Sequence, residues 1–304
     1  MTARPDLTAR PDLTARPDLT ARPDLTARNS PLAPGPAAAA RTLLFVPGNR
    51  PERFAKAAAS AADLVIVDLE DAVPEDSKAT ARDFVTQWLC ADGRSAVRIN
   101  GTKGVHYQQD VTALAGLPGL AAVVVPMADD PAALAALHQR LGRDVEIVAL
   151  IETALGVVRA VDLASTPGVS RLAFGHLDFA ADIDSSIDDE AMLMARSTLV
   201  IASKAAGLPG PVDGVTTALD DPALSGADAA RARRLGFTGK LCLHPNQVEA
   251  VNAAFTPSEE EIAWARRIIE ASTTGGVVRV DGHMVDAPVI VKAQNILAQA
   301  EERA

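Results

Sequence analysis

The chain has 304 residues, of which 48% are hydrophobic, and a formal net charge of −10. This length is sufficient for a large single core, and the acidic balance argues against nucleic acid as the main partner. Every apolar run is shorter than the roughly 18 residues that a membrane span requires, so we do not expect a membrane partner. Cys90 and Cys242 provide neither a disulfide framework nor a metal-ligand spacing, which favours a reducing cytoplasm.

Residues 1–40 differ in composition from the rest of the chain. They contain four copies of TARPDL followed by TARNSPLAPGPAAAA. Proline recurs in every copy, which interrupts any helix, and the repeat is too polar to bury a core. Each copy pairs one arginine with one aspartate, whereas a transit peptide is poor in acidic residues. We therefore expect residues 1–40 to form a disordered leader without catalytic residues.

From Arg41 onward, short apolar runs alternate with alanine-rich segments of helical character. Runs of Val, Ile and Leu that alternate with helices indicate a parallel sheet. Eight such units over roughly 250 residues fit an α/β fold of the (β/α)8 TIM-barrel type. An open, doubly wound sheet is the alternative, but no glycine-rich dinucleotide fingerprint follows the first strand. The expected strands are residues 42–47, 63–71, 96–100, 121–126, 146–152, 171–175, 211–215 and 240–245.

The chain after the eighth strand is too short for a second domain. The stretch PSEEEIAWARRIIEAS predicts a helix with an N-terminal cap. We therefore expect a barrel over residues 41–255, followed by C-terminal helices and an arm or lid over residues 256–304.

Charged residues gather where the expected strands end. In a barrel, the C-terminal ends of the strands face the active site, whereas the N-terminal ends mainly serve stability. Strand alternation places Arg98 opposite the apolar Val97 and Ile99, and therefore in the barrel mouth. Glu152 likewise shares the inward face of Val148. The strand-end residues are Asp68, Glu70, Asp71, Arg98, Glu152 and Asp178.

Two of these carboxylates predict a metal site. Glu152 and Asp178 would supply hard oxygen ligands, and without a histidine or cysteine cluster they favour Mg²⁺ over Zn²⁺. Magnesium usually keeps waters that a substrate carboxylate and carbonyl can displace. Arg98 would bind a substrate carboxylate through two hydrogen bonds. We expect Glu70 and Asp71 to position Arg98 or to orient water at the metal.

The same residues lie in motifs that resemble those of the citrate lyase β-subunit-like proteins of the HpcH/HpaI aldolase/citrate lyase family. The resemblance extends from Arg41 to about Gln299. It implies a (β/α)8 barrel that assembles as a homotrimer or larger oligomer. The motifs are RTLLFVPGNRPERFAKA, DLVIVDLEDAVPEDSKATAR, VRIN, IETALGV, LAFGHLDFAADI, GLPGPVDGV, GFTGKLCLHPNQV and DGHMVDAPVIVKAQ.

The resemblance also assigns roles to individual residues. It implies that Glu152 and Asp178 hold Mg²⁺ and that Arg98 binds the carboxylate of a 2-oxo acid. It implies that Asp286 is a catalytic residue in the site of a neighbouring subunit. His244 fits a hydrogen-bonded structural histidine better than a base.

The implied reaction is the Mg²⁺-dependent cleavage or formation of a carbon–carbon bond. A β-hydroxyacyl-CoA such as malyl-, citramalyl- or citryl-CoA would give an acyl-CoA and a 2-oxo acid. Arg50, Arg53 and Lys78 are candidates for binding CoA phosphates, with a plain surface role as the alternative. Three other functions stay open: a pyruvate aldolase that binds no CoA, the β subunit of a citrate lyase complex acting on a carrier-protein thioester, and a non-catalytic binding protein.

Overall fold

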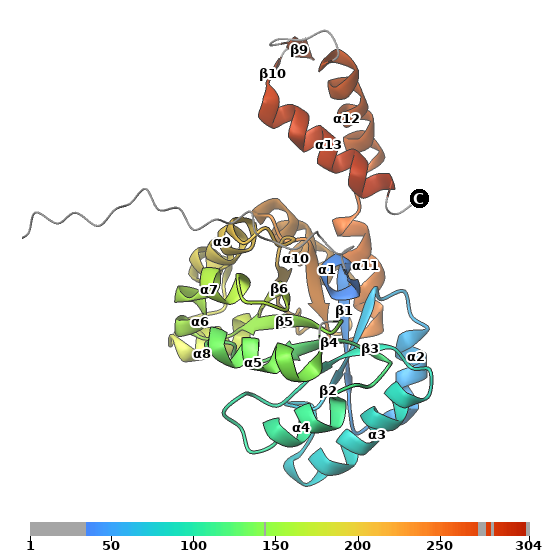
Figure 1. Ribbon diagram of the computed structural model, residues 1–304. Coiled ribbons are helices and arrows are strands. Elements are labelled where there is room, and N and C mark those ends of the chain that lie inside the picture. The colour runs from blue at the N-terminus through green and yellow to red at the C-terminus, as the bar shows by residue number, and fades with distance from the viewer. Residues whose placement is uncertain (1–34, 143, 273–277, 281–282, 302–304) are drawn as a thin grey trace, which may run out of the picture. The chain divides into compact units, whose positions relative to one another are not determined.

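A computed structural model describes residues 35–142, 144–272, 278–280 and 283–301. Eight parallel strands form a closed barrel in which each strand pairs with the next, and the eighth pairs with the first (Figure 1). The strands are β1 (Thr42–Pro47), β2 (Leu64–Asp68), β3 (Ser95–Arg98), β4 (Leu120–Val125), β5 (Glu146–Ile151), β6 (Val169–Phe174), β7 (Val212–Asp213) and β8 (Gly239–Cys242). The predicted barrel fold is therefore confirmed.

Helices follow the strands and cover the outside of the barrel (Figure 1). Several begin at an aspartate whose side chain accepts a backbone N–H of the first turn, as Asp130, Asp188 and Asp221 do. The barrel helices are α2 (Phe54–Ala58), α3 (Lys78–Cys90), α4 (Tyr107–Leu114), α5 (Pro131–Leu141), α6 (Ala154–Val158), α7 (Ala160–Ala164), α8 (His176–Asp182), α9 (Asp189–Ala205), α10 (Pro222–Leu235) and α11 (Pro245–Phe255), with short 3₁₀ turns at Pro51–Arg53 and Glu75–Ser77.

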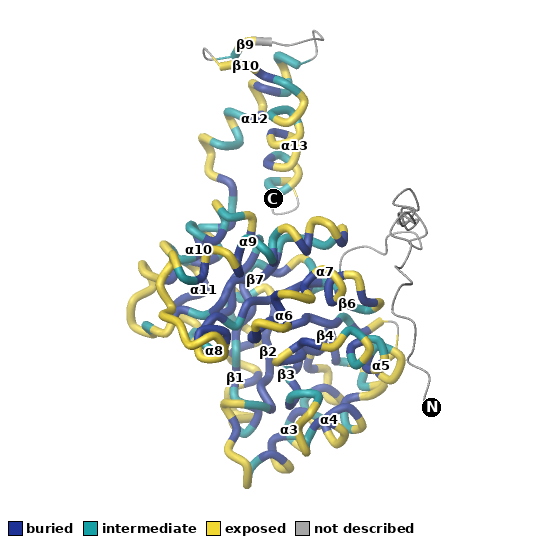
Figure 2. The backbone as a smooth tube through the Cα atoms, turned by 90° about the vertical axis from the view of Figure 1, so that its left-hand side faces the viewer, coloured by how far each residue is buried: buried dark blue, intermediate teal, exposed yellow. Residues whose placement is uncertain are grey.

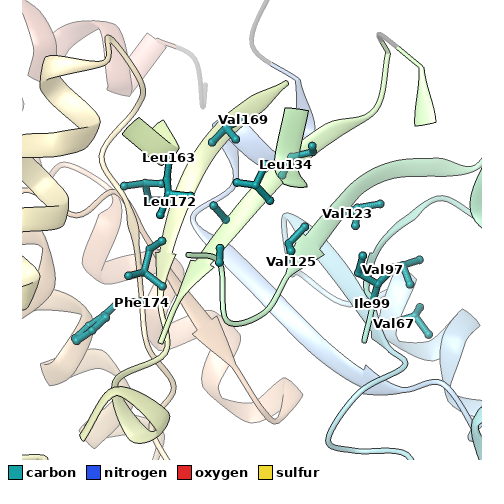
Figure 3. Packing of buried hydrophobic residues seen from close by; sticks show 14 of the residues in the cluster. Val67, Val97, Ile99, Val123, Val125, Leu134, Leu163, Val169, Leu172 and Phe174 are labelled. Atoms are coloured by element: carbon teal, nitrogen blue, oxygen red, sulfur yellow. The ribbon is translucent and has the colours of Figure 1, made fainter. Parts of the chain in front are cut away.

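Strand alternation separates two apolar layers. Outward-facing side chains such as Val97, Val123 and Leu172 pack against the helices (Figure 3). Inward-facing side chains such as Val148 and Leu150 fill the barrel interior. The strands are accordingly buried almost throughout, while the helices expose their outer faces (Figure 2). Because the interior is filled, the open space for a ligand lies at the mouth, beyond the last inward-facing residues.

The opposite end of the barrel holds a short helix, α1 (Pro36–Ala39). The Glu146 carboxylate accepts the N–H groups of Ala37 and Ala38 at 2.8 and 3.1 Å. The buried Arg171 guanidinium donates to the carbonyls of Ala37 and Ala40. The prediction of a disordered leader up to residue 40 is therefore wrong for residues 36–40, because interior polar groups at the barrel floor bind this segment. Residues 1–34 lie outside the described residues.

Strand β2 ends earlier than the sequence predicts. The expected strand ran to residue 71, but pairing stops at Asp68. The Asp68 carboxylate accepts the N–H groups of Glu70 and Ala72 at 2.9 and 3.0 Å. An aspartate that bonds its own backbone two residues onward turns the chain. This turn brings the next two acidic residues over the barrel mouth.

The C-terminal segment has its own small core. Helices α12 (Glu259–Ser272) and α13 (Ala287–Glu301) pack together around Ala265, Ile268, Ala293 and Ile296. Strands β9 (Val278–Val280) and β10 (His283–Val285) form an antiparallel pair between them. Helices are therefore present where the sequence predicts them, and a role for this segment as an arm or lid stays a prediction. Among the described helices, none is long and apolar enough to cross a membrane.

Candidate active site

Residues at the C-terminal ends of the strands line a pocket of about 330 Å³. Its walls come from strands β1, β2, β3, β5, β6 and β8, from the start of α8, and from the segments that follow β2, β5, β7 and β8. The predicted Asp71, Arg98, Glu152 and Asp178 all lie in this one pocket. The lining residues are Phe45, Asp68, Asp71, Ala72, Arg98, Leu150, Glu152, Phe174, Gly175, His176, Leu177, Asp178, Val215, Leu241 and Leu243.

Arg98 stands between three carboxylates. Its Nε and Nη2 donate to the two Asp68 oxygens at 2.8 and 2.6 Å, which is a bidentate ion pair. Its Nη1 lies 3.1 Å from Glu70 and 3.2 Å from Asp71. The guanidinium also lies over the Phe45 ring at 4.8 Å. Asp68 is 1% exposed and orients the guanidinium through this bidentate pair, while Nη1 is engaged by Glu70 and Asp71.

Glu152 is held by a strained backbone. Its Oε2 accepts the Met127 N–H at 2.8 Å, and Met127 has a φ of 49°, in the left-handed region that non-glycine residues rarely adopt. Gly175 lies against the same carboxylate, and a Cβ there would be 2.4 Å from Oε1. Glycine at this position therefore makes room for Glu152. One carboxylate oxygen is fixed by the backbone, and the other stands beside this cleared space.

Asp178 completes the acidic set from the first turn of α8. The site sets five carboxylates, those of Asp68, Glu70, Asp71, Glu152 and Asp178, around the single guanidinium of Arg98. Such an excess of negative charge in a partly dry pocket is unfavourable without a cation. The donor atoms are hard oxygens, which suits Mg²⁺.

A magnesium ion at this site would need water or substrate oxygens as ligands in addition to protein carboxylates. Within the described ranges, no group of three or more His, Cys, Asp or Glu side chains could hold a metal. Glu152 and Asp178 would therefore supply two ligands, and water and substrate oxygens the others. Mg²⁺ is commonly bound through one or two carboxylates with waters retained, so the residues present fit this ion.

The acidic crowding shifts the ionisation of the site. Burial raises the pKa of Glu70 to about 8, with the charges of Asp71 and Glu152 adding to the shift and Arg98 opposing it. Burial also raises the pKa of Glu152 to about 7, although the Met127 N–H lowers it in part. Partial burial and the charge of Asp71 raise the pKa of Asp178. Burial alone would lower the pKa of Arg98, but its three carboxylate partners, Asp68 first among them, together raise it.

These shifts predict a pH-dependent stability that Mg²⁺ modifies. A carboxyl group whose pKa is raised on folding stabilises the protein below its unfolded pKa, and this contribution is lost as the pH rises through the folded pKa. The melting temperature of the metal-free protein should therefore fall as the pH rises from about 4.5, the ordinary pKa of glutamate, and level off above about 7 for Glu152 and about 8 for Glu70. Saturating Mg²⁺ should raise the melting temperature by more at the alkaline end of this range. Calorimetry with and without Mg²⁺ measures both effects.

A Glu70→Gln variant is the control for this titration. It removes one of the two titrating groups, so the metal-free fall should become shallower while Mg²⁺ still stabilises the protein. A melting temperature that stays level over this pH range would contradict the assignment.

Lys78 and Asn100 do not line the pocket. Lys78 is buried, and its ammonium donates to the carbonyls of Leu69 and Glu70 at 2.8 and 2.7 Å and to Asn100 at 2.9 Å. Lys78 therefore fixes the turn that carries the acidic residues, and the prediction that it binds a CoA phosphate is wrong. Arg50 is exposed and pairs with Glu52 at 2.8 Å, which agrees with a surface role.

Asp286 and His244 occupy helix starts. The Asp286 carboxylate accepts the Val289 N–H at 3.4 Å before α13, and Asp286 is not among the pocket-lining residues. Its catalytic role stays a prediction. His244 caps α11, where its Nδ1 accepts the Asn246 N–H, as expected for a structural histidine.

Two features of the site were not predicted from the sequence: the Met127 N–H that holds Glu152, and the apolar lining. The sequence leaves the pairing of Arg98 with Asp68 open as an alternative to substrate binding, and the structure contains this pairing. Asp68 follows the inward parity of Leu64 and Ile66. The positive φ of Met127 leaves no signal in the sequence.

The fold and this pocket define a barrel enzyme whose chemistry takes place at the C-terminal ends of the strands. The chain belongs to the HpcH/HpaI aldolase/citrate lyase family, whose model matches residues 41–245. A second model, the C–C bond lyase of the TIM-barrel fold, matches residues 227–302. The predicted family, and with it the class of carbon–carbon lyases, is confirmed.

Two relatives are similar to this protein over most of its chain. The citrate lyase subunit beta-like protein of Deinococcus radiodurans is 35% identical over 86% of this chain and 98% of its own. The (3S)-malyl-CoA thioesterase of Cereibacter sphaeroides is 38% identical over 86% of this chain and 94% of its own.

Solved structures of a Mycobacterium tuberculosis relative contain ligands. CitE with magnesium, acetoacetate and coenzyme A has a TM-score of 0.77 and 35% identity, covering 87% of this chain and 99% of that one. The citrate lyase beta subunit with oxaloacetate and magnesium has a TM-score of 0.65 and 34% identity, covering 72% of this chain and 99% of that one.

Proposed function

We propose that the protein is a Mg²⁺-dependent carbon–carbon lyase that cleaves, or forms, a β-hydroxyacyl-CoA such as malyl-, citramalyl- or citryl-CoA. The products of cleavage are an acyl-CoA and a 2-oxo acid. The observation that carries this proposal is the convergence of Arg98, Glu152 and Asp178 on one pocket at the barrel mouth. The magnesium, coenzyme A and oxaloacetate bound by the relatives support it.

The charged residues at the barrel mouth each have a role in this reaction. Arg98, oriented by Asp68, would bind the carboxylate of the 2-oxo acid portion in place of the exposed Asp71 at Nη1. Glu152, fixed by the Met127 N–H, and Asp178 hold Mg²⁺. When bound, Mg²⁺ supplies Lewis-acid polarisation of the substrate oxygens. Glu70 and Asp71, both within ion-pair distance of Arg98, position its guanidinium.

A base accepts the proton of the substrate hydroxyl, that oxygen forms the carbonyl of the 2-oxo acid as the carbon–carbon bond breaks, and the bond's electron pair leaves with the acyl thioester as an enolate. Asp286 from a neighbouring subunit would protonate that enolate, or remove the proton in the synthetic direction. This assignment requires a homo-oligomer, which the family resemblance predicts to be a trimer or larger. A cytoplasmic location suits the unpaired cysteines Cys90 and Cys242.

The test is a screen of malyl-, citramalyl- and citryl-CoA for Mg²⁺-dependent cleavage, with the 2-oxo acid product trapped by a dehydrogenase. Cleavage of at least one thioester that stops with a chelator and resumes with Mg²⁺ is the expected result. Cleavage of free 4-hydroxy-2-oxo acids without any CoA thioester would establish the pyruvate aldolase instead. Turnover restricted to a carrier-protein thioester would assign the citrate lyase β subunit.

A further inference from the structure

The pocket has two unlike sides. The charged side comes from β2, β3 and β5 and from the start of α8, and it carries Asp68, Arg98, Glu152 and Asp178. The other side comes from β1 and β8 and from the loop after β7, and these three strands are consecutive neighbours in the closed barrel. We call this side the apolar arc, and its residues are Phe45, Val215, Leu241 and Leu243.

The apolar arc is continuous with the barrel interior but opens to the mouth. Leu241 belongs to the inward-facing core, and Phe45 and Val215 pack against that core. Leu243 is 39% exposed. An apolar ligand group that covers a leucine at the rim of a pocket binds more tightly, because burial of apolar surface is favourable. The arc therefore offers a surface for an alkyl group.

Most of the apolar arc lies away from positive charge. Among the described residues that line the pocket, Arg98 is the sole lysine or arginine; it is bound to Asp68, and within the arc it lies over the Phe45 ring. A carboxylate placed against the other three arc residues would lose hydration, and the described lining offers no second cation to pair with it. The charged side therefore favours the carboxylate end of a small acid, and the apolar arc favours its alkyl end.

We propose that the apolar arc selects a 2-oxo acid with an uncharged alkyl group on its carbonyl carbon, the class of pyruvate and 2-oxobutyrate, over one with a second carboxylate, the class of oxaloacetate. The proposal rests on the proposed function, because it requires the 2-oxo carboxylate to bind on the charged side at Arg98. With that end fixed, the alkyl group faces the apolar arc. The matching thioester then carries a tertiary alcohol with an alkyl branch, as in citramalyl-CoA.

Binding of the 2-oxo acids alone tests this preference without turnover. Isothermal titration of the Mg²⁺-loaded full chain is performed with pyruvate, with 2-oxobutyrate, and with freshly dissolved oxaloacetate. We expect 2-oxobutyrate to bind more tightly than pyruvate, by up to roughly fourfold for its added methylene. Both should bind at least about tenfold more tightly than oxaloacetate, whose second carboxylate has no partner.

A substitution in the apolar arc should invert the preference. Leu243→Arg places a cation at the rim, where the exposed position tolerates a longer side chain. Oxaloacetate should then bind more tightly and 2-oxobutyrate more weakly than in the wild type. Leu193→Arg is the matched control, because Leu193 is 47% exposed on α9 and does not line the pocket. This control should leave the order of the three acids unchanged.

The outcomes separate the two proposals. If no 2-oxo acid binds in a Mg²⁺-dependent manner, the proposed function itself fails. If oxaloacetate binds the wild type as tightly as 2-oxobutyrate, the function stands and the selectivity of the arc is refuted. An unchanged ratio of affinities in Leu243→Arg would likewise show that the substituent lies elsewhere.

Discussion

A Glu152→Gln variant should lose Mg²⁺ binding and at least roughly a hundredfold of kcat while keeping its fold. Glutamine has the same shape and retains a carbonyl oxygen, so it can still accept the Met127 N–H that holds Glu152. What disappears is the negative charge and one hard oxygen ligand. Calorimetric titration with Mg²⁺ and turnover of the best thioester measure the two losses separately.

Strand β5 supplies a matched control for this variant. Glu146 and Glu152 lie on the same inward face, one at each end of the strand, separated by Val148 and Leu150. Glu146 binds the N–H groups of α1 at the barrel floor. Glu146→Gln should therefore cost some stability but leave Mg²⁺ affinity unchanged. Near-normal Mg²⁺ affinity in Glu152→Gln would show that Glu152 is structural and that the metal lies elsewhere.

The same strand shows how much of the site follows from the sequence. A parallel barrel forces side chains to alternate between interior and helices, so an apolar run that ends in glutamate aims that glutamate at the mouth. Arg98 follows from the same parity in β3, beside the outward-facing Val97 and Ile99. The fold and the inward direction of Arg98 and Glu152 were therefore predictable from periodicity, whereas Asp178 lies in α8 and Asp71 on the turn after β2, outside any strand parity.

Contacts between distant segments were not predictable in this way. Ala37 and Ala40 carry no local signal of order, and they become ordered because Glu146 and Arg171 satisfy their backbone groups. Lys78 has the composition of a surface helix start, yet its ammonium is buried against backbone carbonyls 8 and 9 residues earlier. Both cases depend on tertiary partners, which override local propensity.

The Asp286→Asn variant should bind Mg²⁺ and 2-oxo acid normally and lose lyase turnover by at least roughly a hundredfold, the usual scale for a missing acid or base. Asparagine is as good a helix N-cap as aspartate, so α13 should keep its N-terminal hydrogen bond to residue 289. If Asp286 is only a helix cap, this substitution should leave turnover unchanged. If Asp286 is a catalytic acid, turnover should be lost. Turnover close to that of the wild type would leave Asp286 as a cap.

Mixing two inactive variants tests whether Asp286 acts between subunits. The family resemblance assigns Asp286 to the site of a neighbouring subunit, and Asp286 is not among the residues that line the pocket containing Glu152. Asp286→Asn and Glu152→Gln subunits, mixed under conditions that allow exchange, should regain part of the activity, since a shared site can combine an intact Glu152 with an intact Asp286. A second mixture pairs Asp286→Asn subunits with Glu146→Gln subunits, which keep Glu152 and Asp286 intact. Its activity is the reference with which the activity of the first mixture is compared. If tagged subunits are shown to exchange and no activity returns, the arm does not act across the subunit boundary.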